Sequence, residues 1–395
     1  INPKKSRLSP IQRGTYLGFI VDTNVMELSA PADKIQRVKD MIKQVLSQNH
    51  ATPKAMSRIT GSIIALTPAI GTLCRLFTRQ MYHFIEARRF WNQIKRLSAE
   101  VRGECEFWVK NLDEKNGHKV RVTTHITKVV YSDASDRGYG GYVLEKRGVA
   151  IAQGHFSPSE QGTSSTHREL KAVAYMLRSF RNNLQNDIIQ WHTDNTNVAR
   201  IIEAGSTKSD LQALAIKIYE LCLKNNNVIR PVWIPREENT IADLLSRPSD
   251  TDDFSIDYKT FYFIQRRLGR CTVDRFADGR NTKCHRFNSK FYSPNTEAVN
   301  AFTCDWSNEL NWLAPPIHLI GDCIKHAEAC KAKGILMIPL WEASYFFPMV
   351  WNGNGFRRFV KRFEIVNPYY HSPAEKSVFK GHVAFRSVAL LIDFS

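Results

Sequence analysis

The sequence predicts a mixed α/β protein built from three consecutive units within its 395 residues. Apolar residues recur at helical spacing through the first third, and the period changes to two near Lys128. Beyond that point, strands and helices alternate in an order typical of a mixed sheet with flanking helices. At the usual ~100–200 residues per domain the length allows two or three domains. We place the units at 1–124, 125–248 and 258–395.

The first unit is expected to be mostly helical. Residues 15–21, Thr-Tyr-Leu-Gly-Phe-Ile-Val, are predicted to form one strand. Pro31 then opens a helix that closes at Asn49, and Thr52-Pro53 starts a second helix. Further helical pattern with aromatic anchors runs from about residue 71 to residue 112.

The middle unit is predicted to contain five strands and the helices that pack on them. The expected strands span 129–133, 140–144, 150–156, 188–193 and 228–234, and the expected helices lie near 166–181, 195–204, 208–224 and 239–246. This order, β-β-β-α-β-α-α-β-α, favours a mixed sheet covered by helices. Pro248 and the acidic stretch 249–257 are predicted to form a linker to the third unit, which alternates strands, helices and Pro-rich turns.

The charge is concentrated in the first unit. The chain carries a formal net charge of +17, and the three units carry +11, +2 and +4. A polyanionic partner is therefore expected, and the first unit is where it would be bound.

Composition also limits where the protein works. No stretch approaches the ~18–20 apolar residues of a membrane span, and the basic start is not followed by the apolar run of a signal peptide. Eight cysteines in 395 residues do not form a disulfide framework. We therefore expect an intracellular protein of the cytoplasm or nucleus, not secreted and without a membrane partner. Cys323, His326 and Cys330 share a helix face, which suits either helix packing or, with a fourth ligand, a zinc site.

Four acidic residues of the middle unit lie where predicted strands end and helices begin. Asp133 ends the first strand, and Asp194 follows the fourth. Glu169 lies in the first turn of the first helix, and Asp243 lies in the last short helix. Because such positions can meet at one edge of a sheet, the carboxylates are expected to converge and to bind hard cations such as Mg²⁺. Two such ions about 3.5–4 Å apart can activate a water and stabilise the leaving oxygen of a phosphodiester.

Each carboxylate also has a purely structural explanation. Thr166 and Glu169 have the spacing of a capping box, and Asp194 can cap the helix that follows it. Asp243 can favour the dipole of its short helix. Asp133 is the hardest to explain in this way, because strands disfavour Asp. Taken together and in order, the four predict hydrolysis of a nucleic-acid backbone.

The four carboxylates stand within four ordered motifs. These are Tyr-Ser-Asp-Ala-Ser-Asp-Arg-Gly-Tyr-Gly-Gly (131–141), Thr-His-Arg-Glu-Leu-Lys-Ala-Val (166–173), Thr-Asp-Asn-Thr (193–196) and Glu-Asn-Thr-Ile-Ala-Asp-Leu-Leu-Ser-Arg (238–247). In this order they resemble the ribonuclease H domain of retroelement polyproteins, and in particular that of DIRS-type retrotransposons. The resemblance implies a ribonuclease H-like sheet over about 125–248 and endonucleolytic hydrolysis of the RNA strand of RNA–DNA hybrids.

The resemblance also implies a role for each acid. Asp133 would bridge two Mg²⁺ ions, for which Mn²⁺ can substitute. Glu169 and Asp194 would complete the ion on the leaving-group side, and Asp243 the ion on the water side. Many family members have a His on the strand before the last Asp, where it helps product leave. Here Trp233 stands in that place, so slower turnover is expected.

The first unit is similar to the end of a reverse transcriptase. Tyr16-Leu17-Gly18-Phe19, a basic helix, a Gly-bearing helix and the Phe107-Trp108 pair resemble the primer grip, thumb and connection that precede a retroelement ribonuclease H. The Tyr-x-Asp-Asp motif of the polymerase is missing, so this chain cannot polymerise alone. The resemblance implies an upstream polymerase palm of the same polyprotein as a partner.

The third unit resembles the adenine methylase-like region of the same elements. Its motifs are Val-Asp-Arg-Phe-Ala (273–277), Asn-Thr-Lys (281–283), Ala-Phe-Thr-Cys-Asp-Trp (301–306) and Leu-Ala-Pro-Pro-Ile (313–317), with the strand-like run 335–339 after them. Dam-type methylases, to which it is similar, need Asp/Asn-Pro-Pro-Tyr to accept the adenine amino group and to stack on the flipped base. Ala314 and Ile317 stand in those places, so we expect a methyltransferase-like α/β domain without methylation.

The main prediction is therefore a metal-dependent ribonuclease H within a retrotransposon polyprotein. Two alternatives stay open. The first is a non-catalytic nucleic-acid-binding module whose carboxylates are structural, which would show salt dependence but no requirement for Mg²⁺. The second is adenine DNA methylation by the third unit, which would require binding of S-adenosylmethionine.

Overall fold

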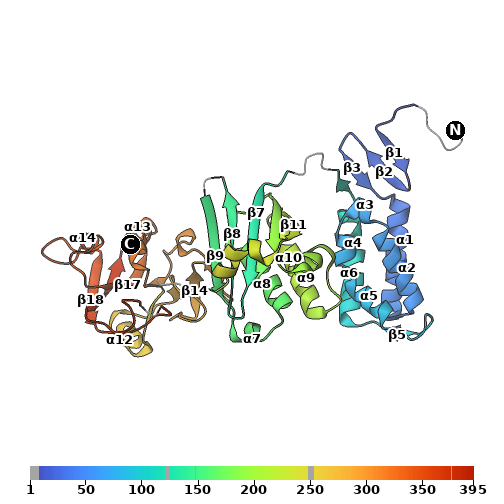
Figure 1. The fold of residues 1–395 in the computed structure, drawn as a ribbon. Coiled ribbons are helices and arrows are strands. Elements are labelled where there is room, and N and C mark those ends of the chain that lie inside the picture. The colour runs from blue at the N-terminus through green and yellow to red at the C-terminus, as the bar shows by residue number, and fades with distance from the viewer. Residues whose placement is uncertain (1–8, 121–124, 147, 248–252, 375) are drawn as a thin grey trace.

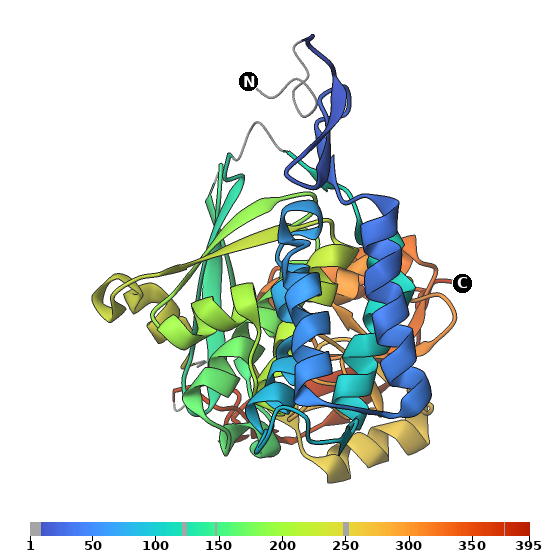
Figure 2. The same ribbon diagram turned by 90° about the vertical axis from the view of Figure 1, so that its right-hand side faces the viewer.

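The structure, a computed structural model, describes residues 9–120, 125–146, 148–247, 253–374 and 376–395. Figure 1 shows three units in a row, from the N-terminal helices to the C-terminal sheet. The view at 90° superimposes the units, so the molecule is elongated in one direction (Figure 2). The predicted boundary at 124 and the beginning of the predicted linker at Pro248 lie outside the described residues.

The first unit packs helices beside a small antiparallel sheet. The sheet has the order β1-β2-β3-β6, with strands Arg13–Tyr16, Phe19–Asp22, Glu27–Ser29 and His118–Lys119. The helices are α1 (Ala32–Gln48), α2 (Pro53–Ile64), α3 (Thr67–Ile70), α4 (Leu73–Leu76), α5 (Arg79–Glu86) and α6 (Ala99–Lys115), and β4 (His50–Ala51) pairs with β5 (Lys95–Arg96). The apolar face of α1 is buried, and Asn49 ends the helix in the left-handed conformation, as the sequence predicts.

The prediction of a single strand over 15–21 is wrong, because this segment is a hairpin. Strands β1 and β2 run antiparallel with Tyr16 opposite Phe19. Leu17 and Gly18 form the two-residue turn, with φ angles of 49° and 78°. Such a turn matches the twist of the two strands, although the left-handed conformation disfavours the Leu side chain. A Leu inside an apolar run gives no sequence signal for a turn.

The middle unit is a five-stranded mixed sheet with the order β11-β10-β7-β8-β9. Its strands are β7 (Lys128–Ala134), β8 (Gly138–Glu145), β9 (Gly148–His155), β10 (Ile188–Thr193) and β11 (Val228–Trp233). The first three are antiparallel neighbours, β10 lies parallel to β7, and β11 lies parallel to β10. The predicted fold class, α/β with a mixed sheet and flanking helices, is confirmed.

Helices connect and cover these strands. They are α7 (Pro158–Gln161), α8 (Ser165–Ser179), α9 (Thr196–Ala204), α10 (Ser209–Lys224), the 3₁₀ turn η1 (Arg236–Glu238) and α11 (Thr240–Leu245). One continuous apolar core runs from the first unit into the middle unit. At their contact, the Gln212 amide nitrogen donates to the Leu76 carbonyl at 2.6 Å, and the Phe77 and Tyr219 rings meet edge to face.

The third unit contains a seven-stranded sheet with the order β15-β14-β13-β16-β17-β21-β18. Its strands are β13 (Val273–Asp274), β14 (Arg286–Ser289), β15 (Ala298–Val299), β16 (Leu310–Leu313), β17 (Lys333–Pro339), β18 (Val360–Val366) and β21 (Ser387–Asp393). The first five in this order are parallel, and β21 runs antiparallel to both β17 and β18. The other elements are α12 (Tyr258–Leu268), η2 (Ala301–Thr303), η3 (Ile317–Leu319), α13 (Ile320–Ala329) and α14 (Phe347–Val350).

A small sheet replaces part of the predicted linker. Ser255–Ile256 form β12, which pairs with β19 (Tyr369–His371), and β19 pairs with β20 (Gly381–His382). The linker prediction over 249–257 is therefore wrong at its C-terminal end. The acidic composition of the stretch gave no sign that two of its residues pair with a strand more than a hundred positions away.

The sequence composition gave expectations about membrane-spanning segments and about the cysteines, and the described residues bear on both. None of the described helices is long and apolar enough to cross a membrane. The eight cysteines, all within the described ranges, are free thiols. In α13, Cys323 is fully buried in the core, whereas His326 contacts the Cys304 carbonyl at 2.9 Å and the Cys330 sulfur at 3.5 Å. This arrangement favours helix packing over the zinc site.

Candidate active site

Asp133 lies near the C-terminal end of β7, the central strand of the middle sheet. The β-branched and aromatic residues Val129, Val130 and Tyr131 favour a strand here, and the strand continues through Asp133, which pairs with Gly140 of β8. The preceding Ser132 accepts a hydrogen bond from the Trp191 indole at 2.8 Å, which ties β7 to β10. The Asp133 residue is only 8% exposed, so its carboxylate lies in a position where charge is costly.

Glycine in β8 lets helix α11 approach that carboxylate. A Cβ placed on Gly140 would lie 2.1 Å from the Leu245 carbonyl carbon, so the helix backbone occupies the space of the missing side chain. Two hydrogen bonds hold the ends of α11 to β7 and to the turn that follows it. The Ser135 hydroxyl donates to the Ser246 carbonyl at 2.6 Å, and the Asn239 amide donates to the Ser132 carbonyl at 3.1 Å.

Glu169 faces the end of β10 and does not cap its own helix. Ser164 is the N-cap of α8, accepting from the His167 amide at 3.3 Å, so the capping box expected from Thr166 and Glu169 is not formed. The Glu169 carboxylate instead accepts hydrogen bonds from the Asn195 side chain at 2.9 Å and from the Thr193 hydroxyl at 3.4 Å. Its partners are therefore the residues that flank Asp194.

Asp194 is likewise free of the structural role considered for it. The N-cap of α9 is Asn195, whose side chain accepts from the Asn197 and Val198 amides at 3.0 and 3.4 Å. The Asp194 carbonyl accepts a hydrogen bond from the Trp233 indole at 3.0 Å. Trp233 is half exposed at the end of β11, directly beside the strand end that carries Asp194.

Asp243 is held by two arginines that the sequence analysis did not consider. Both of its carboxylate oxygens accept from Arg247 at 2.8 Å, one turn further along the chain, and Arg236 reaches it at 3.3 Å. One guanidinium nitrogen of Arg247 thus contacts both carboxylate oxygens, which fixes the orientation of the Asp243 side chain. A signal was present in the sequence, since Arg247 stands four residues after Asp243.

Burial and neighbouring charge raise the pKa of Asp133. Burial is the largest cause, and the negative charges of Asp194 and Asp243 add to it. A hydrogen bond from Ser246 acts in the opposite direction. Asp133 therefore lies within electrostatic reach of two other predicted site residues.

The same causes act more strongly on Glu169, whose pKa rises to about 7. Burial is again the largest cause, and the charges of Asp194 and Asp133 contribute. The hydrogen bonds from Asn195 and Thr193 lower the pKa without offsetting the rise. Perturbed carboxyl groups of this kind cluster at functional sites, although ion-pair networks also produce them.

The carboxylate oxygens of these residues are suitable ligands for a hard cation. The side chains, as they are placed here, do not yet form a metal site. Across the ranges that the structure describes, no three His, Cys, Asp or Glu side chains lie close enough together to hold a metal ion. Asp133, Glu169 and Asp194 nevertheless repel one another from three different elements, and a divalent ion relieves such repulsion. Asp243 fits less well, because Arg236 and Arg247 already neutralise it.

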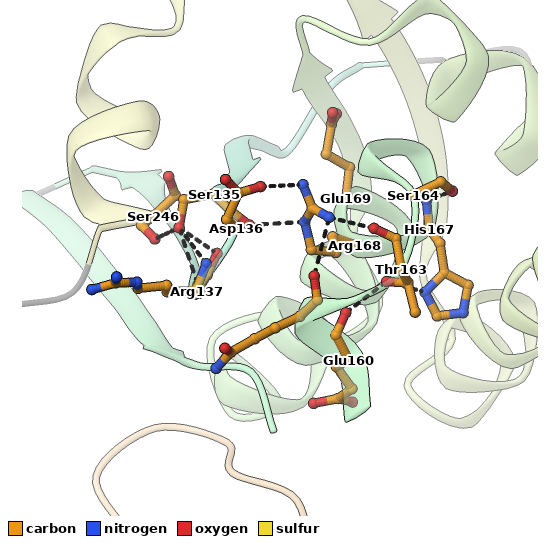
Figure 3. Close-up of polar contacts among 12 residues, drawn as sticks. Ser135, Asp136, Arg137, Glu160, Thr163, Ser164, His167, Arg168, Glu169 and Ser246 are labelled. Atoms are coloured by element: carbon orange, nitrogen blue, oxygen red, sulfur yellow. Dashed lines mark hydrogen bonds and ion pairs between the residues drawn. The ribbon is translucent and has the colours of Figure 1, made fainter. Parts of the chain in front are cut away.

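Arg168 joins the two loops on either side of the site. Its guanidinium donates to the Ser135 carbonyl at 3.1 Å, to the Asp136 carboxylate at 2.6 Å and to the Thr163 carbonyl, and it is only 12% exposed. Figure 3 shows this side chain between the β7–β8 turn and the α7–α8 loop. It therefore fixes the end of β7, which carries Asp133, against the start of α8, which carries Glu169. Sequence inspection did not single it out, although it precedes Glu169 directly.

Solved structures of ribonucleases H and reverse transcriptases resemble parts of this chain at low overall similarity. RNase H1 from the halophilic archaeon Halobacterium salinarum is 18% identical over 30% of this chain and 92% of its own, with a TM-score of 0.27. LC11-RNase H1 in complex with an RNA/DNA hybrid is 20% identical over 30% and 93%, with a TM-score of 0.26. A foamy viral protease-reverse transcriptase in complex with an RNA/DNA hybrid is 16% identical over 60% and 31%, with a TM-score of 0.24. No protein of curated function matches the chain.

The sequence itself matches a known family over the middle unit. Residues 125–220 fit the family described as an RNase H-like domain found in reverse transcriptase. The match contains Asp133, Glu169 and Asp194, and it ends before the helix that carries Asp243. Residues 125–220 are thus similar to an RNase H-like domain of the kind found in reverse transcriptases.

Proposed function

We propose that the middle unit is a ribonuclease H that cuts the RNA strand of RNA–DNA hybrids by metal-dependent hydrolysis. The observation that carries this proposal is that Asp133, Glu169 and Asp194 lie within electrostatic reach of one another where β7 and β10 end. They come from the end of one strand, a neighbouring helix and the end of the next strand. The structural roles that could have explained Glu169 and Asp194 are filled by Ser164 and Asn195.

Two Mg²⁺ ions, or Mn²⁺ in their place, are the proposed cofactors. Asp133, Glu169, Asp194 and Asp243 would hold them through their carboxylate oxygens. When bound, such ions activate a water and stabilise the leaving oxygen of a phosphodiester.

The protein groups around these acids have separate tasks in the proposal. Asn195 and Thr193 orient the Glu169 carboxylate through hydrogen bonds. Arg168 sets the position of the Asp133 strand end against α8. Arg247 holds Asp243 through both carboxylate oxygens, so Asp243 must exchange at least part of this pairing before it can serve as a ligand.

The surrounding chain suits a duplex partner within a reverse transcriptase polyprotein, and we propose a DIRS-type retrotransposon as its source. The +11 charge of residues 1–124 supports binding of a hybrid through its phosphates. In this proposal the first unit is the thumb and connection, and a polymerase palm of the same polyprotein is its partner.

The competing proposal is a nucleic-acid-binding module without catalysis, located in the cytoplasm or nucleus like the first. One observation favours it, namely the neutralisation of Asp243 by Arg236 and Arg247. Binding through phosphates alone weakens with salt and needs no divalent ion. A requirement for Mg²⁺ therefore separates the two proposals.

For the third unit we propose a methylase-like fold without methylation. Its strand order reverses between β13 and β16, the kind of place where open α/β sheets bind ligands. A cavity of about 380 Å³ lies there, lined among others by Phe276 and Ala314 of the third unit and by His155 of the middle unit. Ala314 presents a methyl group where Dam-type methylases carry an acceptor for the adenine amino group. Incubation with S-adenosylmethionine and DNA is expected to give no methyl transfer to the DNA. Methyl transfer would establish the alternative, adenine DNA methylation by the third unit.

The nuclease is tested with the full chain and a labelled RNA–DNA hybrid, in Mg²⁺, Mn²⁺ or EDTA. Labelled single-stranded RNA and a DNA duplex of the same sequence serve as matched substrates. The proposal expects internal cuts in the RNA strand of the hybrid alone, in either metal and not in EDTA. Binding of the hybrid without any cut in Mg²⁺ or Mn²⁺ would favour the binding module.

A further inference from the structure

The third unit touches the middle unit through the loop that follows β14. Strand β14 ends at Ser289, and Phe291 and Tyr292 leave the third unit to pack against the core shared by the first two units. The Tyr292 amide donates to the Ser179 hydroxyl at 2.9 Å, and the Tyr292 carbonyl accepts from the Tyr139 hydroxyl at 2.6 Å. Both the amide and the carbonyl of Tyr292 are thereby hydrogen-bonded to the middle unit.

The ring of Tyr292 makes a second set of contacts on helix α8. It lies 4.8 Å from the Tyr175 ring, and the Arg178 guanidinium stands over it at 4.4 Å. Arg178 also donates to the Tyr292 hydroxyl. Tyr175, Arg178 and Ser179 occupy the last two turns of α8, so the loop holds the C-terminal end of that helix.

The contact on β8 is tightly fitted. Tyr139 is fully buried, and a Cβ on Gly154 of β9 would lie 2.6 Å from its ring. Without the Tyr292 carbonyl, the buried hydroxyl would keep only the Ser179 oxygen at 3.5 Å. A buried hydroxyl left without a partner is costly, so the docked loop stabilises this position.

Both contact points belong to elements that carry the candidate site. Helix α8 bears Glu169 near its other end, and Tyr139 of β8 stands beside Gly140, the residue paired with Asp133. We propose that the third unit serves as a brace, in which Tyr292 holds α8 and β8 and so fixes Glu169 relative to Asp133. This inference rests on the proposed ribonuclease H activity, and it gives the third unit a role that requires no chemistry of its own. Tyr292 is here a positioning residue, since it acts through α8 and β8.

The test compares Tyr292→Ala with Tyr292→Phe in the full chain. Tyr292→Phe keeps the backbone bonds, the ring and the Arg178 guanidinium over it, and loses only the hydrogen bond from Arg178 to the hydroxyl, whereas Tyr292→Ala removes the ring from α8. Tyr262→Ala is the matched control, because this tyrosine of the same unit is 58% exposed on α12. Each variant is measured by hydrogen exchange of the α8 amides and by kcat and KM on the hybrid.

The brace predicts faster exchange in the last turns of α8 for Tyr292→Ala, with kcat lowered roughly 10- to 100-fold and KM little changed, as for a small misplacement of a reacting group. Tyr292→Phe and Tyr262→Ala should behave as the wild type does. Unchanged exchange in a folded Tyr292→Ala protein, or faster exchange with unchanged kcat, would overturn the brace. If Tyr292→Ala does not fold, Tyr292→Leu, which fills more of the space but still removes the aromatic ring from α8, takes its place with the same expectations. If the wild type cuts no hybrid, the proposed nuclease fails, and the exchange measurement alone decides whether Tyr292 holds α8.

Discussion

At the scale of single residues, the charge of Glu169 is controlled by its surroundings. Burial and the charges of Asp194 and Asp133 raise its pKa to about 7, against hydrogen bonds from Asn195 and Thr193. In the metal-free protein the group therefore takes up a proton near neutral pH. A divalent ion can use this carboxylate only in its ionised form, so metal binding should compete with protons below pH 7.

The raised pKa of Glu169 gives a stability prediction with a definite sign. A carboxyl whose pKa is higher in the folded state binds more protons when folded, so its contribution to stability falls as the pH rises toward the folded pKa near 7. Glu169→Gln removes this cost. In EDTA, we expect the variant to melt a few degrees above the wild type at pH 8, with the difference disappearing toward pH 5, as followed by circular dichroism. A variant that melts below the wild type at pH 8 would contradict the assignment.

Trp233 gives a kinetic prediction. Its indole donates to the Asp194 carbonyl from the position where the resemblance places a His that helps product leave. Trp233→His is therefore expected to raise the multiple-turnover rate several-fold and to leave the single-turnover rate nearly unchanged. Rapid-quench measurements on the hybrid separate the two rates. An equal fall in both would show that the indole supports the chemical step itself.

At the scale of elements, the site depends on how closely α11 can approach β8. The Leu245 backbone fills the place of a side chain at Gly140, and hydrogen bonds from Ser135 and Asn239 hold the ends of α11 beside β7. This approach brings Asp243 within electrostatic reach of Asp133.

Gly140→Ala should therefore displace α11. The added Cβ would meet backbone that cannot rotate away, and we expect a loss of about 1–3 kcal/mol in the free energy of unfolding, as for overpacked sites. Urea unfolding measures this loss, and hybrid cleavage should fall with it. Gly162→Ala is a matched control, because a Cβ on Gly162 meets nothing within 4 Å. Equal stability of the two variants would refute the close approach of α11.

At the scale of the whole molecule, the pattern along the chain predicted the five strands and the longer helices of the middle unit in the right order, and missed the short helix α7. Local patterns failed where distant contacts decide the structure. The two-residue turn at Leu17-Gly18 lies inside an apolar run, and Ser255–Ile256 pair with β19 although their composition suggests a linker.

The candidate site was likewise predictable from the sequence only in part. Order and residue type along the chain suggested Asp133, Glu169, Asp194 and Asp243, and the last three all lie within electrostatic reach of Asp133. The residues that orient them could not be recognised in advance, because their roles depend on rotamers and on loops that meet in space. The position of Arg168 between two loops is an example, whereas the four-residue spacing of Asp243 and Arg247 was a signal that the sequence did contain.

The central claim is metal-dependent cleavage that relies on Asp133, and it is tested most directly by one comparison. The full chain and Asp133→Asn are assayed on a labelled RNA–DNA hybrid in Mg²⁺, with Asp210→Asn, an exposed acid in the first turn of α10, as the control. We predict that the wild type and Asp210→Asn cut the RNA strand at similar rates. Asp133→Asn should bind the hybrid but cut it at least about 100-fold more slowly, as when one electrostatic stabiliser of a transition state is lost. Cleavage by Asp133→Asn at the wild-type rate would contradict the account.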